Sequence, residues 1–176
     1  MGEAKTIGKV LISEEQIRQR VAEVGAEITK DFEGESVLLV GVLRGAVVWL
    51  ADLMRQIDLD VSIDFMDCSS YGASTKTSGV VRINKDLNED ISGKNVIIVE
   101  DIIDSGITLA YLKKNLSERG AKCVKTCSLL DKPEGRLVEV EGDYVGFTVD
   151  NVFIVGYGLD YDQSYRQLPY ITCLED

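Results

Sequence analysis

The sequence contains no histidine, only two prolines among its 176 residues, and four cysteines that form no Cys-x-x-Cys pair. Protein zinc sites are built mainly from cysteine and histidine, so the sequence supplies few ligands for one. A Ser/Gly/Pro-rich stretch that would link two modules is also missing. We therefore expect a single domain that covers residues 1–176.

Long hydrophobic runs are missing as well. No stretch approaches the roughly 18 apolar residues that a membrane helix needs. The segment Met1–Lys9 carries charges but no apolar signal core. We expect a cytoplasmic protein that does not interact with a membrane.

Positive charge is scarce. The chain has 19 Lys and Arg against 30 Asp and Glu, which gives a net charge of −11. Such a charge repels nucleic acid at long range, so we expect no nucleic-acid partner. If the substrate is an anion, locally placed cations or a metal ion must overcome this field.

The N-terminal half shows helix and strand signals in alternation. Ser13 and Gln16 have the spacing of a capping box, and the apolar residues that follow predict a helix from about Glu14 to Lys30. A continuous apolar run from Ser36 to Gly41 predicts a buried strand, and the pattern from Ala46 to Gln56 predicts a second helix.

The same alternation continues further along the chain. The apolar runs Asn95–Val99 and Cys123–Leu130 predict strands, and the helical pattern between them ends at Gly120. This order is typical of the α/β class, in which a parallel sheet is covered by helices on both faces. Ligands are then expected at the carboxyl ends of the strands.

Three segments differ from this pattern. Alternation from Val61 to Phe65 predicts a strand whose apolar residues Val61, Ile63 and Phe65 form its buried face. The polar stretch Ser69–Gly79 has no periodicity and is expected to be a mobile loop. Strands near Tyr144–Val149 and Val152–Val155 are expected to form a small hood, contributed by the C-terminal and N-terminal segments.

Two adjacent acids end the third predicted strand. Glu100 and Asp101 follow the apolar run that begins at Val96, so at least one of them must point into a crevice at the edge of the sheet. Two neighbouring carboxylates are unfavourable unless a cation or a polyhydroxyl ligand lies there.

Small and hydroxyl residues follow the acids. Ser105, Gly106 and Thr108 supply hydroxyl groups and backbone N–H groups at the start of a helix. A helix start of this composition favours the binding of a phosphate.

The thirteen residues Val96–Thr108 resemble the phosphoribosyl-pyrophosphate signature of the type I phosphoribosyltransferases. The flanking chain resembles the hypoxanthine-guanine branch of that family over nearly its whole length. The resemblance implies an enzyme of purine salvage that transfers the 5-phosphoribosyl group from phosphoribosyl pyrophosphate to hypoxanthine or guanine, giving IMP or GMP and pyrophosphate. It also implies Mg²⁺ as cofactor and a homodimer or homotetramer.

The resemblance assigns roles within the signature. Glu100 and Asp101 are implied to engage the ribose hydroxyls and magnesium. Asp104 is implied to lie near N7 of the purine as the catalytic group that exchanges a proton, a role that suits a carboxylate in a chain without histidine. The residues implied to wrap the 5-phosphate are Asp104, Ser105, Gly106, Ile107 and Thr108. Ile107 stands where some family members have a lysine, so one possible cation is missing.

Other segments resemble the family's pyrophosphate-binding parts. Leu43-Arg44-Gly45 resembles a loop that often holds a non-proline cis peptide bond between its first two residues, an isomer that sequence does not reveal. Ser70-Tyr71 resembles the catalytic lid that closes over the pyrophosphate and excludes water. Arg166 is implied to contact pyrophosphate.

The purine site is implied by three further segments. Lys132 resembles the lysine that donates to O6 of the base, Phe153 would stack on the purine, and the Ile154 backbone would read the edge of the ring. Asp160 is implied to close this site near pyrophosphate and a second magnesium. Taken alone, Phe153 and Ile154 are equally typical of core strand residues.

Two readings remain open beside this one. The chain could be a phosphoribosyltransferase that prefers xanthine, since the sequence does not rank the purines. It could also be a non-catalytic, nucleotide-binding regulator on the same fold, although the acidic balance and the full set of catalytic elements favour the enzyme.

Overall fold

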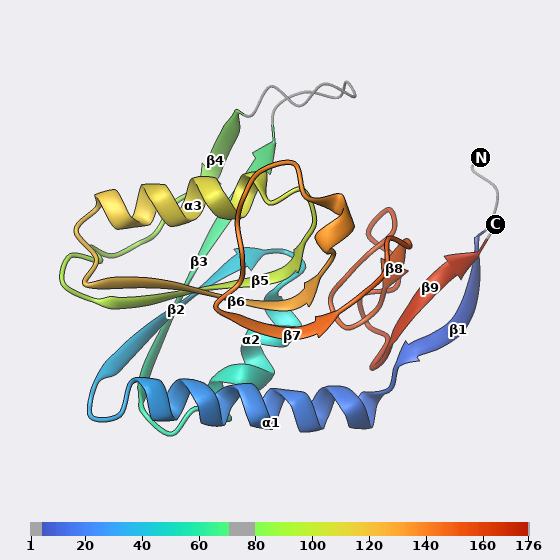
Figure 1. Ribbon diagram of the computed structural model, residues 1–176, viewed down its shortest axis with the longest axis horizontal. Coiled ribbons are helices and arrows are strands. Elements are labelled where there is room, and N and C mark those ends of the chain that lie inside the picture. Colours follow the sequence, from blue (N-terminus) through green and yellow to red (C-terminus); the bar gives the residue numbers. More distant parts are fainter. Residues whose placement is uncertain (1–4, 71–79, 176) are drawn as a thin grey trace.

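The computed structural model describes residues 5–70 and 80–175 and is built around a six-stranded sheet (Figure 1). The order of its strands is β4-β3-β2-β5-β6-β7, and all neighbours are parallel except β4, which runs antiparallel to β3. The α/β class with a mainly parallel sheet is therefore confirmed. The strands are β2 (Ser36–Leu43), β3 (Asp60–Ser70), β4 (Val81–Lys85), β5 (Asn95–Ile103), β6 (Cys123–Asp131) and β7 (Tyr144–Thr148).

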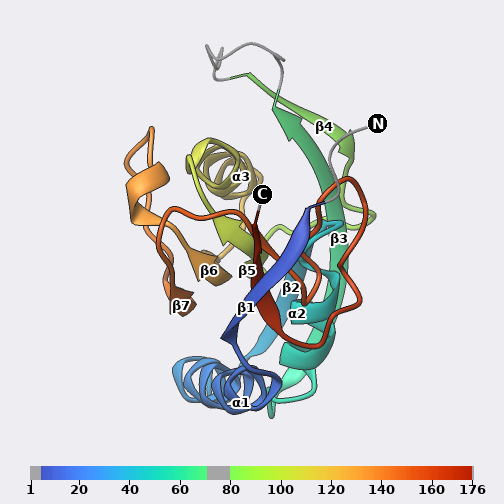
Figure 2. The same cartoon turned by 90° about the vertical axis from the view of Figure 1, so that its right-hand side faces the viewer.

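Helices cover both faces of this sheet. Helices α1 (Glu14–Asp31) and α2 (Val47–Met54) lie on one face, and α3 (Ile107–Glu118) lies on the other (Figure 2). Successive strand residues point to opposite faces. Leu39 of β2 therefore packs in the core with α1 and α2, while its neighbour Leu38 packs in the core with α3. This is why the central strands read as unbroken apolar runs. Within the described residues, no helix is long and apolar enough to cross a membrane.

A second sheet forms the predicted hood. It contains β1 (Thr6–Ile12), β8 (Ile154–Val155) and β9 (Ile171–Glu175) in the order β1-β9-β8, so the two ends of the chain lie together (Figure 1). The placement of Tyr144–Val149 in this hood is wrong. That strand is β7, which pairs in parallel with β6 of the main sheet. The physical reason is that β7 covers an edge that β6 would otherwise expose.

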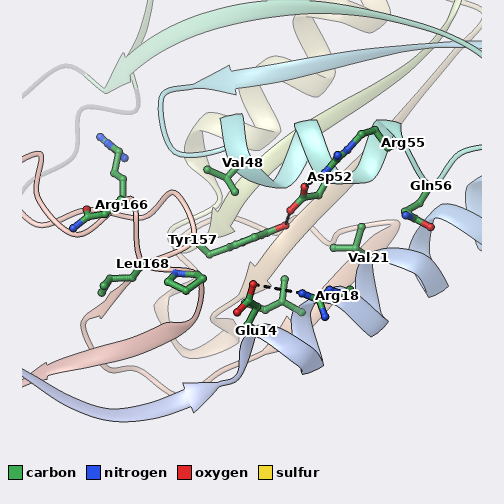
Figure 3. A pocket seen from close by; sticks show the side chains of 13 residues that line it. Glu14, Arg18, Val21, Val48, Asp52, Arg55, Gln56, Tyr157, Arg166 and Leu168 are labelled. Atoms are coloured by element: carbon green, nitrogen blue, oxygen red, sulfur yellow. Dashed lines mark hydrogen bonds and ion pairs between the residues drawn. The ribbon is translucent and has the colours of Figure 1, made fainter.

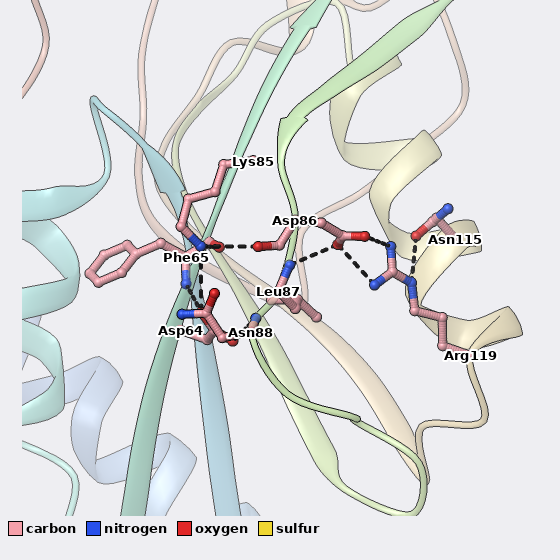
Figure 4. A network of polar contacts seen from close by, with 8 residues as sticks. All are labelled: Asp64, Phe65, Lys85, Asp86, Leu87, Asn88, Asn115 and Arg119. Atoms are coloured by element: carbon pink, nitrogen blue, oxygen red, sulfur yellow. Dashed lines mark hydrogen bonds and ion pairs between the residues drawn. The ribbon is translucent and has the colours of Figure 1, made fainter.

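The predicted buried face of β3 is also wrong in part. Ile63 is 43% exposed, whereas Asp64 is only 8% exposed. The Asp64 carboxylate is compensated because it accepts hydrogen bonds from the backbone N–H groups of Phe65, at 2.7 Å, and Asn88, at 2.9 Å. Lys85 Nζ lies 3.9 Å from it (Figure 4). Alternation alone does not reveal such partners, and a buried carboxylate is tolerated only where they exist.

The same polar network anchors the chain after β4. Arg119, the C-cap residue of α3, donates to the Asp86 carboxylate at 3.1 Å and to Asn115 at 3.0 Å (Figure 4). The hydrogen bond from Arg119 lowers the pKa of Asp86. Lys85 Nζ donates to the carbonyl of Phe65 at 3.0 Å. The network therefore holds the base of the β3–β4 hairpin to both the sheet and α3.

The capping box of α1 is confirmed. Ser13 Oγ accepts a hydrogen bond from the backbone N–H of Gln16 at 3.1 Å, and Gln16 Oε1 accepts one from the backbone N–H of Ser13 at 2.8 Å. The helix begins at Glu14, as predicted, and ends at Asp31.

We predict that Ser13→Ala lowers the free energy of unfolding by about 1 kcal/mol, because one N–H group at the helix start loses its acceptor. Urea denaturation followed by circular dichroism measures this change. Ser62→Ala, at an exposed position of β3, is the control and should change stability by less than about 0.5 kcal/mol. Equal losses in both variants would show that the cap contributes nothing.

Candidate active site

The site lies where the chain reverses direction across the sheet. From β2 the chain passes outward to β3, and it later returns to β5 on the other side of β2. The helices that follow these two strands lie on opposite faces of the sheet, so the loops at their carboxyl ends diverge. In open α/β sheets, ligands bind in the crevice that this divergence leaves.

The two predicted acids stand at the carboxyl end of β5. Glu100 is 8% exposed, and its carboxylate accepts a hydrogen bond from the backbone N–H of Asp101 at 3.1 Å. Asp101 in turn accepts from the backbone N–H of Ile102 at 2.7 Å. Burial, together with the nearby charge of Asp101, raises the pKa of Glu100 well above its usual value. A cation beside this pair would favour the charged forms.

A cavity of about 230 Å³ opens beside Glu100, between the ends of β2 and β5 and the start of α3, and Asp101 does not contribute to its lining. Gly106 is the N-cap of α3, and Ser105 Oγ accepts from the backbone N–H of Ile107, the first helical residue, at 3.3 Å. The N-terminus of a helix attracts anions. The predicted site residues that line the cavity are Leu43, Glu100, Asp104, Ser105, Gly106 and Thr108.

The loop after β2 closes directly onto Asp101. The peptide bond between Leu43 and Arg44 is cis, the isomer often found in the family that the sequence resembles. A Cβ atom on Gly45 would lie 1.8 Å from Oδ2 of Asp101, so a larger residue there would force the Asp101 side chain to move. A Cβ atom on Gly158 would lie 2.3 Å from the carbonyl oxygen of Gly45. Three segments that are distant in sequence therefore pack closely, Gly45 against the Asp101 side chain and Gly158 against the Gly45 backbone.

The two predicted pyrophosphate arginines converge on one acceptor. Arg44 Nη1 donates to Gln163 Oε1 at 2.9 Å, and Arg166 Nη2 donates to the same oxygen at 3.0 Å. Arg166 also pairs with Asp160 at 3.3 Å and donates to the carbonyl of Gly158 at 2.6 Å. Sequence reasoning missed Gln163, because its partner Arg44 is 119 residues away and no local pattern connects them.

Lys132 and Asp104 lie on neighbouring loops. Lys132 follows β6, is 8% exposed, and donates its backbone N–H to the carbonyl of Ile103 at 2.9 Å. A Cβ atom on Gly135 would lie 2.0 Å from Oδ1 of Asp104. The loop that starts at Lys132 thus packs directly on the Asp104 carboxylate.

Phe153, the predicted stacking residue, is not buried as a core residue would be. Phe153 is 48% exposed, whereas its neighbour Ile154 is 5% exposed. The Phe153 ring meets Tyr161 edge to face at a centroid distance of 5.5 Å, and Lys5 Nζ lies 5.6 Å from its centroid. Phe153 therefore offers aromatic surface, while Ile154 belongs to the core.

Of the predicted lid residues Ser70 and Tyr71, only Ser70 lies in the described part of the chain. Ser70 is the last residue of β3, is exposed, and pairs with Val81 of β4. Tyr71 and the rest of residues 71–79 lie outside the described part of the chain.

A larger hollow, of about 610 Å³, lies between α1, α2 and the segment 166–169, and Arg166 contributes to its lining (Figure 3). Its other charged groups pair with one another. Asp52 accepts from the Tyr157 hydroxyl and from Arg55, and Arg18 pairs with Glu14. The carboxylates and the helix start described above do not line it, so size alone does not identify the site.

Comparison with known proteins identifies the class. Residues 11–162 match the family described as the phosphoribosyl transferase domain. The chain belongs to this family.

The individual relatives define the branch. The hypoxanthine-guanine phosphoribosyltransferase of Bacillus subtilis is 52% identical over 169 residues, which cover 96% of this chain and 94% of that protein. The enzyme of the same name from Lactococcus lactis is 51% identical over 171 residues, which cover 97% and 93%. Bifunctional TilS/HprT proteins of Listeria are also similar, at 53% to 54% identity, and the chain spans 26% of their length.

Solved structures agree with this assignment. A hypoxanthine-guanine phosphoribosyltransferase of Bacillus anthracis has a TM-score of 0.92 at 46% identity, covering 98% of this chain and all of that one. A hypoxanthine phosphoribosyltransferase of Staphylococcus aureus has a TM-score of 0.93 at 43% identity, covering 96% and 92%. The resemblance to the hypoxanthine-guanine branch and the type I fold are therefore confirmed.

Proposed function

We propose that this chain transfers the 5-phosphoribosyl group from phosphoribosyl pyrophosphate to hypoxanthine or guanine, releasing pyrophosphate and giving IMP or GMP. One observation carries the proposal. Glu100, Asp104 and the start of α3 line one cavity at the switch point of the sheet, and the loop that begins at the buried Lys132 packs on Asp104. The names of the relatives support the same reaction.

The donor substrate would bind along the crevice. The helix start from Asp104 to Thr108 would hold the 5-phosphate through backbone N–H groups and hydroxyls. Glu100 and Asp101 would accept hydrogen bonds from the ribose hydroxyls. The pyrophosphate would contact the Leu43–Gly45 loop, Arg166 and the lid residues Ser70 and Tyr71.

The acids fit a magnesium ion that arrives with the substrate. The described residues contain no group of three side chains that could hold a metal by themselves. Magnesium is commonly bound by one or two carboxylates together with substrate phosphates and water. Glu100 and Asp101 match that pattern, and Asp160 is the predicted ligand of a second ion. When bound, magnesium would neutralise charge on the leaving pyrophosphate.

The protein groups have distinct tasks in the transfer. A ring nitrogen of the base attacks the anomeric carbon while the bond to pyrophosphate breaks, through a state with oxocarbenium character. Arg44 and Arg166 stabilise the charge that develops on pyrophosphate. Asp104 accepts the proton from N7 of the purine, since its carboxylate faces the crevice beside the Lys132 loop.

Purine recognition would depend on Lys132 and Phe153. The Lys132 ammonium has donors only and suits the O6 acceptor of an oxopurine. The exposed ring of Phe153 offers a stacking surface. The described residues do not rank xanthine against hypoxanthine and guanine. The dimer or tetramer, the cytoplasmic location and the lack of a nucleic-acid partner also stay predictions.

A product assay tests the proposed function. The protein is mixed with phosphoribosyl pyrophosphate, magnesium and one purine at a time, and nucleotide and pyrophosphate are measured together. We expect equal amounts of both with hypoxanthine and guanine. Turnover with xanthine alone would identify the xanthine-preferring alternative. Tight RNA or nucleotide binding without any pyrophosphate release would identify the regulator.

Magnesium should be obligatory. The pyrophosphate would otherwise lie against Glu100, Asp101 and Asp160, and like charges in a crevice repel strongly. We predict loss of detectable turnover when EDTA exceeds magnesium and full recovery when magnesium is added back. Undiminished turnover in EDTA would contradict the role given to the acids.

Asp104→Asn should reduce kcat by roughly 10²- to 10⁴-fold, the range for loss of a positioned acid–base group. The amide keeps the shape of the side chain but does not accept the proton. Steady-state kinetics with hypoxanthine measures the change. Asp58→Asn, at an exposed position between α2 and β3, is the control. If the folded variant keeps more than a tenth of the wild-type kcat, another group handles N7.

Lys132→Ala should reduce kcat/KM for hypoxanthine and guanine by about 10-fold or more, because the charge-assisted hydrogen bond to O6 is lost. The dissociation constant of phosphoribosyl pyrophosphate should change less than about threefold, since the phosphate is held by a different loop. Adenine should be a very poor substrate of the wild type. Lys9→Ala, on exposed β1, is the control. Efficient use of adenine by the wild type would refute the assignment.

A further inference from the structure

The loop that carries Lys132 is folded over the phosphate-binding loop. The backbone N–H groups of Leu137 and Val138 both donate to the carbonyl of Ser105, at 2.9 and 3.3 Å. The backbone N–H of Lys132 donates to Ile103. The two loops are therefore joined along their length, although they follow different strands.

Arg136 lies at the centre of this junction. Its Nη1 donates to the carbonyls of Ile103 at 3.1 Å, Asp104 at 3.0 Å and Lys132 at 3.4 Å. Its Nε donates to the carbonyl of Val140 at 3.1 Å, and its Nη2 pairs with the Asp131 carboxylate. The side chain is 18% exposed.

Arg136 lies just beyond the end of the β5–β6 ladder, where its guanidinium can bind the backbone of both strand ends. The parallel ladder between β5 and β6 ends at the pair Ile103 and Asp131. Beyond it, the carbonyls of Asp104 and Lys132 have no ladder partner; that of Lys132 accepts from the backbone N–H of Gly135 at 3.1 Å, and both accept from Arg136. A planar guanidinium with five donors reaches both backbones at once, whereas a lysine ammonium is a compact group on a flexible stem.

We propose that Arg136 is a positioning residue that clamps the Lys132 loop onto the phosphate loop at Asp104. The clamp fixes the separation between the place where the purine is read and the place where the 5-phosphate of the same nucleotide binds. The proposal rests on the proposed function, because it assigns Lys132 and the phosphate loop to the two ends of one ligand.

A second arginine provides a matched control. Arg20 has a side chain that is 25% exposed and donates to the carbonyls of Val145 at 2.8 Å and Gly146 at 3.0 Å. It joins α1 to β7 and does not contact the two loops. If Arg136 only stabilised the fold, Arg136→Lys and Arg20→Lys should have the same effects on the Lys132 loop and on ligand binding.

Hydrogen exchange tests the clamp without any ligand. In Arg136→Lys, the amides of Lys132 and Leu137 should exchange at least about 10-fold faster than in the wild type, because their loops separate more often. In Arg20→Lys these amides should keep their protection. Unchanged exchange in Arg136→Lys would overturn the clamp. Arg136→Gln, which also removes the charge, is the second variant and should show the same faster exchange. If it does not fold, Arg136→Lys, which keeps the charge, still decides the question.

Binding of GMP, measured by calorimetry, tests the functional role. We expect Arg136→Lys to raise the Kd of GMP roughly 10-fold in the wild-type background but less than threefold in a Lys132→Ala background, because much of its effect acts through Lys132. Arg20→Lys should leave the Kd within threefold of the wild type. Equal effects of Arg136→Lys in both backgrounds, or an equal effect of Arg20→Lys, would overturn the proposal. If the wild type does not bind GMP, the proposed function fails and the positioning role fails with it, while the exchange measurement still reports on the clamp.

Discussion

The arrangement of the site depends on the parallel pairing of β2 with β5, the two buried strands at which the chain reverses across the sheet. Their register, with Gly41 opposite Val99, brings Leu43 and Asp101 to the same edge two residues further on. Gly45 can then pack its backbone against the Asp101 carboxylate, and the segment at Gly158 packs against Gly45. A one-residue shift in this register would turn the side chains of one strand to the other face and would separate these groups.

The chain has a net charge of −11, which would repel the proposed ligand with its several phosphates. Cations placed near the site would offset this repulsion. The acids Glu100 and Asp101 come from one strand end, whereas the cations come from separate segments. Arg44 and Arg166 meet at Gln163. Lys132 comes from the loop after β6, where Arg136 donates to its carbonyl. Cations that come from several loops can act on one anionic ligand only if those loops are held at fixed distances.

The fold was predictable where the signal was local. The capping box at Ser13, the apolar runs of β2 and β5, and the leucine spacing of α3 depend on residues within one or two turns of each other, so these elements were correctly predicted. Strands β1 and β9 were missed because each is stabilised by a partner at the opposite end of the chain. The burial of Asp64 and the place of β7 likewise depend on distant segments. The signature from Glu100 to Thr108 predicted the phosphate end of the proposed site, whereas the contacts of Gln163 and Arg136 became visible only in three dimensions.

The crevice between the ends of β2 and β5 is the proposed binding site of phosphoribosyl pyrophosphate. The most direct test is calorimetric binding of this compound, with magnesium, to wild type and Gly45→Ala. A methyl group at Gly45 would collide with the Asp101 side chain, whereas Ser62→Ala, at an exposed position of β3, serves as the control. We expect Gly45→Ala to weaken binding by about 100-fold or more, while Ser62→Ala stays close to wild type. A folded Gly45→Ala protein that binds with wild-type affinity would contradict the account.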